Sequence, residues 1–158
     1  KNPIIYKPKI ITQTKTSCDY SDLEHALKNS KRPLVLAGYG IRRSNNVGNF
    51  VKFINKYQIP YVSTYGARDY TPNDDRLSIG TVGQRGSRAG NFALQNADLL
   101  LILGSTLNAS VIGYDPKQFS PLSYKIQVDI DRDETMKDIV KIDKTYIDDL
   151  TFFFDEMI

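Results

Sequence analysis

A run of five apolar residues, Leu99–Leu103, constrains the fold of this chain more than any other feature. A continuous apolar run of this length between polar residues is typical of a strand that is buried on both faces of a parallel sheet. Pro33–Ala37 has the same character and ends in Gly38-Tyr39-Gly40, which predicts a second buried strand followed by a tight turn. We expect the Leu99–Leu103 strand to be central in the sheet.

Helical patterns alternate with these strands. Residues 46–57 place Val47, Phe50, Val51, Ile54 and Tyr57 on one face, as an amphipathic helix does. We expect other helices at 21–30, with Ser21 or Asp22 as the cap, from the glycine cluster 83–90 to Asn96, at 133–138 and at 148–157. Further strands are expected at 61–64, 124–130 and 139–147, and long loops at 66–83 and 104–123. The alternation predicts an α/β, Rossmann-like parallel sheet of about six strands with helices on both faces.

Length and composition limit the class of protein. The chain has 158 residues, which is enough for one core, and its apolar runs are far shorter than the roughly 20 residues that a membrane helix needs. No signal peptide opens it, so we expect a cytoplasmic protein with no membrane partner. Its one cysteine, Cys18, excludes an internal disulfide and a multi-cysteine metal site, and with a single histidine, His25, no metal site is predicted.

Charge is unevenly distributed along the chain. Lys and Arg total 21 against 18 Asp and Glu, but residues 1–16 hold four lysines and no acid. The remainder therefore carries 17 basic and 18 acidic residues, with 31–88 basic and 129–156 acidic. We interpret residues 1–18, which contain Pro3 and Pro8, as an extended arm. The arginines of the body lie near glycines rather than among aromatic residues, which favours a small anion and argues against nucleic acid.

Two glycine clusters follow predicted strands. In a parallel sheet, ligands bind at the carboxyl ends of the strands. Gly38 and Gly40 supply the first two glycines of a dinucleotide-binding fingerprint but not the third, so a tight turn without a ligand explains them equally well. The second cluster, with Gly83, Arg85, Gly86 and Arg88, lacks the Lys-Ser/Thr pair of a P-loop. Its arginines could neutralise a diphosphate or face water.

Acidic residues after the strand at 124–130 offer a further candidate site. Asp129 and Asp131 point to the same side of the chain. They could accept hydrogen bonds from the hydroxyl groups of a ribose, or they could cap the next helix. A calcium loop is excluded because Glu134 stands where such a loop needs glycine. We find no nucleophile, general base or other constellation that would act as a catalytic residue, and His25 has the character of a surface residue.

The order of segments resembles a known family. Five segments carry the resemblance, in order and at matching spacing: 32–40, 59–64, 83–98, Gly104-Ser105 and 128–131. Nearly the whole chain is similar to the central domain of thiamine-diphosphate-dependent enzymes of the acetolactate synthase group. The resemblance implies that residues 19–158 form this domain and that residues 1–18 form the linker from the pyrimidine-binding domain.

The resemblance also implies an enzyme whose chemistry lies outside this chain. In the family, thiamine diphosphate is held between the flanking domains by a catalytic glutamate and a Gly-Asp-Gly magnesium motif, and this chain has no Gly-Asp-Gly. The parent would decarboxylate or ligate 2-oxoacids as a homodimer or homotetramer, and this fragment alone would be inactive.

A nucleotide site in the central domain is the last implication. Family members hold FAD, ADP or nothing there. By analogy Gly38, Gly40, Gly83, Arg85, Gly86, Arg88, Gly104, Ser105, Asp129 and Asp131 would line the site. The family usually has arginine where this chain has Thr106. The absence of that arginine removes a charged partner of a diphosphate. We therefore expect the isolated domain to bind FAD or ADP weakly if at all. The alternative is a stand-alone FAD- or ADP-binding or assembly module without thiamine chemistry.

Overall fold

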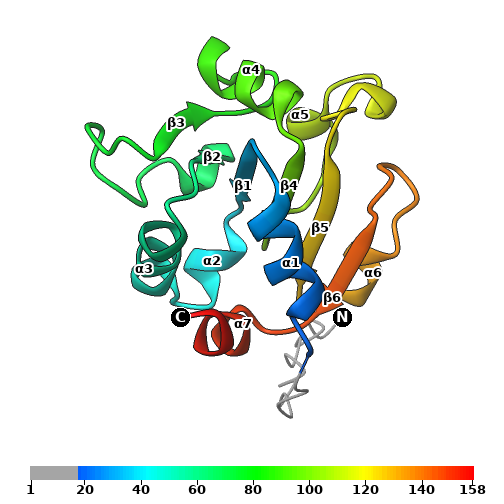
Figure 1. The fold of residues 1–158 in the computed structure, drawn as a ribbon. Coiled ribbons are helices and arrows are strands. Elements are labelled where there is room, and N and C mark those ends of the chain that lie inside the picture. The colour runs from blue at the N-terminus through cyan, green and yellow to red at the C-terminus, as the bar shows by residue number, and fades with distance from the viewer. Residues whose placement is uncertain (1–17) are drawn as a thin grey trace, which may run out of the picture.

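The computed structural model describes residues 18–158, and the predicted arm at residues 1–18 lies, except for Cys18, outside the described part. Strands and helices alternate along the chain (Figure 1). The strands are β1 (Pro33–Ala37), β2 (Tyr61–Ser63), β3 (Ser78–Thr81), β4 (Leu99–Leu103), β5 (Tyr124–Asp129) and β6 (Lys144–Ile147). The helices are α1 (Ser21–Asn29), α2 (Gly40–Arg43), α3 (Val47–Tyr57), α4 (Arg88–Asn96), α5 (Ala109–Ile112), α6 (Arg132–Thr135) and α7 (Leu150–Met157), with short 3₁₀ turns η1 (Tyr65–Ala67) and η2 (Pro116–Gln118).

All six strands are parallel and lie in the order β3-β2-β1-β4-β5-β6. This is the order of the doubly wound dinucleotide-binding folds, and it confirms the predicted Rossmann-like α/β sheet with β4 at its centre. The direction of winding reverses between β1 and β4. Leu103 pairs with Ala37 on one side and with Val128 on the other, so the carboxyl ends of three strands meet at one edge.

Helices cover both faces of the sheet because the central strands are apolar on both sides. Val35, Leu101 and their alternate neighbours pack against α1, α3 and α7, which contribute fully buried Phe50, Phe53 and Phe153. Leu36 and Ile102 point to the other face and pack against a second cluster that includes Leu94, Val111, Ile112 and Phe119. In Figure 1, α1, α3 and α7 lie on the side of the sheet away from α4 and α5. The continuous apolar pattern of β1 and β4 thus produces two cores.

Several predicted bounds were wrong. The loop expected at 66–83 contains β3. This edge strand lacks the apolar run that marks β4, because all its residues are only partly buried. Its Gly80 also has a positive φ of 133°. The loop expected at 104–123 contains α5 and η2. The strand expected at 139–147 begins only at Lys144, and the helix expected at 133–138 is the single turn α6.

The expected cap of α1 was also wrong. Tyr20, not Ser21 or Asp22, is the N-cap residue. Its side chain makes no capping bond, and its hydroxyl donates to Asp148 at 2.6 Å. The α1 entrance is therefore fixed by a buried contact to the start of α7. Within residues 18–158, no helix is long and apolar enough to cross a membrane.

Candidate functional site

A cleft of about 650 Å³ lies at the carboxyl ends of the strands. Each wall continues directly from a strand: Tyr39 and Gly40 follow β1, Gly104 to Thr106 follow β4, and Asp129 to Asp131 end β5. Thr64 to Gly66 after β2, and Asp149 with Leu150 after β6, complete the rim. The cleft therefore occupies the switch point of the sheet, where ligands of open α/β folds bind.

Half of the residues predicted for the site lie at this cleft. Gly40, Gly104, Ser105, Asp129 and Asp131 line it. Gly38 lies directly beneath, where its N–H donates to the carbonyl of Leu103 at 2.9 Å. Whether these residues hold a cofactor stays a prediction, but the structure brings them together.

The second glycine cluster lies outside the lining of the cleft. Gly83 packs against the backbone of Ser110, so that this loop supports one wall of the cleft without facing it. Gly86 lies against the backbone of Val82, and Arg85 and Arg88 are exposed. Close packing between β3 and α4 accounts for this part of the sequence, and its predicted contact with a cofactor stays a prediction.

The cleft carries more negative than positive charge. In the part of the chain that the structure describes, four carboxylates line it, from Asp129, Asp131, Glu134 and Asp149, whereas the one lining cation is Arg43. Asp131 caps α6 by accepting the N–H of Asp133, Asp149 caps α7 in the same way, and Glu134 forms an exposed ion pair with Lys137. Arg43, Glu134 and Asp149 were not among the residues predicted for the site. Their positions just after predicted turns or strand ends were the available signal.

Asp129 is the most buried of these carboxylates, at 8% exposure. One of its oxygens accepts the N–H of Asp131 at 3.0 Å. Burial raises the pKa of Asp129, and the negative charges of Asp131 and Glu134 raise that pKa further. The ionised form of Asp129 therefore lowers the free energy of unfolding.

We predict that Asp129→Asn stabilises the chain at pH 7. Asparagine can still accept the Asp131 N–H and carries no charge, while below the ordinary aspartate pKa of about 3.9 the wild-type side chain is protonated both folded and unfolded. The wild type should therefore fall below the variant in stability as the pH rises from about 4 to 7. Thermal unfolding of both proteins across this pH range measures the difference in stability. The unfolding midpoint should shift by roughly 2–4 °C for each kcal/mol. A variant that is less stable than the wild type by the same amount at pH 7 and at pH 4 would contradict the burial argument.

Ser105 presents an unsatisfied polar group at the cleft. The residue is 2% exposed and lies at the end of β4 beside the cleft, and its hydroxyl has no hydrogen-bond partner among residues 18–158. A buried hydroxyl without a partner costs free energy, and native proteins seldom leave one so. The hydroxyl oxygen is itself buried, so it is enclosed by the protein rather than open to the cleft.

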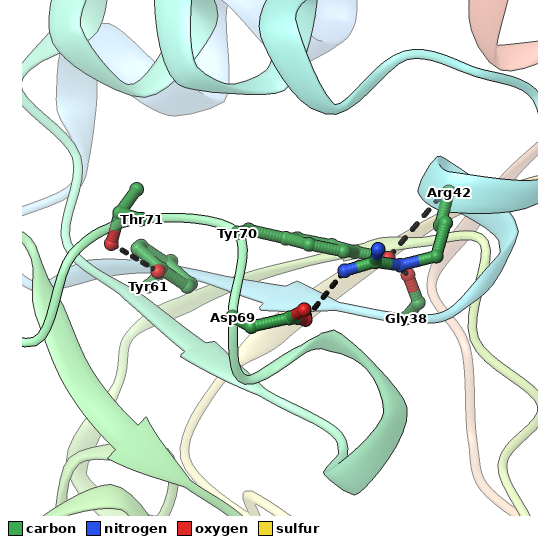
Figure 2. Close-up of polar contacts among 6 residues, drawn as sticks. All are labelled: Gly38, Arg42, Tyr61, Asp69, Tyr70 and Thr71. Carbon is green, nitrogen blue, oxygen red and sulfur yellow. Dashed lines mark hydrogen bonds and ion pairs between the residues drawn. The ribbon is translucent and has the colours of Figure 1, made fainter.

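The loop between β2 and β3 is fastened to the turn after β1 (Figure 2). The Tyr70 hydroxyl donates to the carbonyl of Gly38 at 2.9 Å and accepts the backbone N–H of Arg42 at 3.2 Å. The Arg42 guanidinium lies 5.3 Å from the centre of the Tyr70 ring and forms an ion pair with Asp69. Since Arg42 is engaged in this way, it is not one of the residues that line the cleft.

We predict that Tyr70→Phe destabilises the chain by about 1–3 kcal/mol. The change keeps the ring but leaves the buried Gly38 carbonyl without this donor. Urea unfolding measures the loss. The matched control is Tyr114→Phe, which removes a hydroxyl that is 94% exposed and should shift stability by less than about 0.5 kcal/mol. Equal effects of the two changes would contradict the fastening.

The cleft offers little positive charge for the diphosphate of FAD or ADP. Among the described residues that line it, Arg43 is the one cation, against four carboxylates, of which Glu134 is paired with Lys137. Thr106, which takes the place of the expected arginine, is exposed at the rim. For thiamine diphosphate, the chain lacks the Gly-Asp-Gly motif, and residues 18–158 contain no cluster of three or more His, Cys, Asp or Glu placed to hold a metal ion.

Comparison with known proteins gives a consistent family. The family model described as thiamine pyrophosphate enzyme, central domain, matches residues 21–156. The chain is similar to the acetolactate synthase large subunit of Lactococcus lactis subsp. lactis (strain IL1403), at 39% identity over 121 residues, which cover 77% of this chain and 21% of that protein. It is also similar to the probable acetolactate synthase large subunit of Methanococcus aeolicus, at 28% identity over 100% of this chain and 27% of that protein.

A third relative has a different printed activity. The probable sulfoacetaldehyde acetyltransferase of Rhizobium meliloti (strain 1021) is 32% identical over 109 residues, which cover 68% of this chain and 18% of that protein. The chain thus spans between 18% and 27% of the length of these three relatives.

Proposed function

Because this chain belongs to the family of thiamine pyrophosphate enzymes and corresponds to their central domain, we propose that it works as the central part of a longer carboligase or decarboxylase. The parent would act on 2-oxoacids, in the manner of an acetolactate synthase. It would bind thiamine diphosphate and Mg²⁺ between its pyrimidine-binding and diphosphate-binding domains and assemble as a homodimer or homotetramer. The family match across 21–156 is the observation that carries the proposal.

The site supports a positioning role for this domain. The fold resembles a dinucleotide-binding sheet, and residues 18–158 contain no cluster of three or more residues placed to hold a metal ion. Its role in the proposal is to hold the neighbouring domains in place. Fold alone does not specify a reaction, so the proposed substrate class comes from the relatives. The chemistry of carbon–carbon bond formation would be supplied by thiamine diphosphate when it is bound to the flanking domains.

The test is an activity assay of the complete natural polypeptide that contains this chain. We expect it to consume pyruvate or another 2-oxoacid only when thiamine diphosphate and Mg²⁺ are both supplied, whereas the 158-residue chain under the same conditions is inactive. A complete polypeptide that binds thiamine diphosphate but turns over no 2-oxoacid would contradict the proposed substrate class. Activity of the 158-residue chain alone would contradict the positioning role.

A further inference from the structure

We propose that residues 65–76, between β2 and β3, form a strap that opens and closes over one side of the cleft while the sheet stays folded, and that Tyr70 holds the strap closed. This inference concerns the cleft of this chain and does not rest on the activity of the parent. It follows from how few attachments the strap makes and from where they lie.

Backbone hydrogen bonds hold the strap at its two ends. The N–H of Thr64 donates to the carbonyl of Ala37 at 3.0 Å, and the carbonyl of Leu77 accepts the N–H of Tyr61 at 2.8 Å. Between these points, among the residues that the structure describes, the backbone hydrogen bonds of the strap stay within the loop and the first residue of β3. A segment with so few backbone bonds to its surroundings can open at a lower free energy than the paired strands beside it.

The side-chain hydrogen bonds from the strap to other elements come from three consecutive residues in the described part of the chain (Figure 2). Asp69 forms an ion pair with Arg42, but both side chains are exposed, so this pair contributes little. The hydroxyl of Thr71 lies 2.7 Å from that of Tyr61. Tyr70, between them, makes the remaining two bonds. The attachment of the strap is therefore concentrated at one short stretch.

Tyr70 combines burial with hydrogen bonding. Its hydroxyl joins two backbone groups of the turn after β1, the carbonyl of Gly38 and the N–H of Arg42. The residue is 5% exposed, and its ring packs edge-on against Phe50 of α3, with 5.7 Å between the ring centres. Loss of the Tyr70 hydroxyl should therefore shift the strap toward its open state.

The start of the strap is part of the cleft wall. Tyr65 and Gly66 line the cleft, and a Cβ built on Gly66 would lie 3.1 Å from the ring of Tyr39, which lines it too. Ala67, the next residue, is fully buried in the core on the α3 side of the sheet. Opening the strap moves Tyr65 and Gly66 away from Tyr39, which widens the cleft, and it uncovers Ala67.

The experiment measures how fast a buried thiol in the strap reacts with dithionitrobenzoate. We expect an Ala67→Cys variant of the 158-residue chain, in a Cys18→Ser background, to react at least about tenfold faster than Val35→Cys in the same background. Both positions are fully buried in the same core, but Val35 lies within β1. Low urea concentrations should scarcely change the rate of Ala67→Cys, because opening of the strap exposes little surface. Equal rates with equal urea dependence would overturn the proposal, since the strap would then open only when the sheet unfolds.

Tyr70→Phe tests the residue that holds the strap closed. Added to Ala67→Cys, it should raise the rate of thiol reaction about tenfold, as expected for the loss of a buried hydrogen-bonding hydroxyl, and the weak urea dependence should remain. Tyr114→Phe, which removes a fully exposed hydroxyl, is the control and should leave the rate unchanged. The same rate with both changes would contradict the role of Tyr70.

Hydrogen exchange of the unaltered chain is the second measurement, and it needs no cysteine variant to fold. The N–H of Ala67 donates to the carbonyl of Thr64 at 2.9 Å and belongs to a fully buried residue, so its exchange reports opening of the strap. It should exchange at least about tenfold faster than the slowest amides of β4. Equal protection of Ala67 and β4 would overturn the proposal.

Discussion

Replacing Gly38 with alanine should destabilise the chain by about 3 kcal/mol or more, the upper end of what overpacking costs. The added Cβ would lie 2.1 Å from the Gly104 carbonyl oxygen and 2.5 Å from the Ser105 Cα, and both belong to the backbone at the end of β4. Relief would require separating β1 from β4, which pair along their whole length at the centre of the sheet. Urea unfolding followed by circular dichroism measures the loss.

The matched control is Gly48→Ala. Gly48 lies in α3, and a Cβ built there meets nothing within 4 Å. Alanine is the better helix former, so this change should stabilise the chain by about 0.5–1 kcal/mol. Opposite signs for the two glycines are the expected result. A Gly38→Ala variant within about 0.5 kcal/mol of the wild type would show that the turn can relax and that the close approach is not required.

Phe153→Ala should cost about 3–5 kcal/mol, a large part of the total of roughly 5–15 kcal/mol typical of such domains. The Phe153 ring is fully buried. Its centre lies 5.1 Å from that of Phe154, 5.2 Å from that of Tyr20 and 5.6 Å from that of Phe53. Truncation would open a cavity where α1, α3 and α7 meet over the sheet.

Phe92→Ala is the control for this prediction, because Phe92 is 69% exposed on α4 and should tolerate alanine within about 0.5 kcal/mol. Thermal unfolding of the two variants side by side gives the comparison. Equal costs would mean that the aromatic cluster of α7 does not carry the core on this face of the sheet.

The strands at the centre of the sheet could be predicted from the sequence because burial on both faces leaves an unbroken apolar run. β4 is buried at all five positions, and β1 at four of five. β3 could not be predicted, since it pairs only with β2 at the edge and none of its side chains is fully buried. The position of β3 is determined by its hydrogen bonding to β2, and the hydrophobic pattern of residues 78–81 carries no sign of that pairing.

The position of the cleft could be predicted from the sequence, but its negative charge could not. Gly40, Gly104, Ser105, Asp129 and Asp131 follow strands, and strand ends converge in any parallel sheet. Its negative charge arises because Asp149, far along the chain, joins the acids of β5 once β6 pairs beside them. That the Ser105 hydroxyl finds no partner among the described residues likewise depends on which donors and acceptors surround it in three dimensions.

The central claim is that this chain is one domain of a longer thiamine-diphosphate-dependent enzyme. The most direct measurement is the mass, in extracts of the source cells separated by size, of the polypeptide that yields peptides from residues 21–156. Because the chain spans 21% and 27% of two relatives, we expect a polypeptide several times larger than 17.9 kDa that also yields a peptide with Gly-Asp-Gly. Peptides confined to a protein near 17.9 kDa would contradict the account.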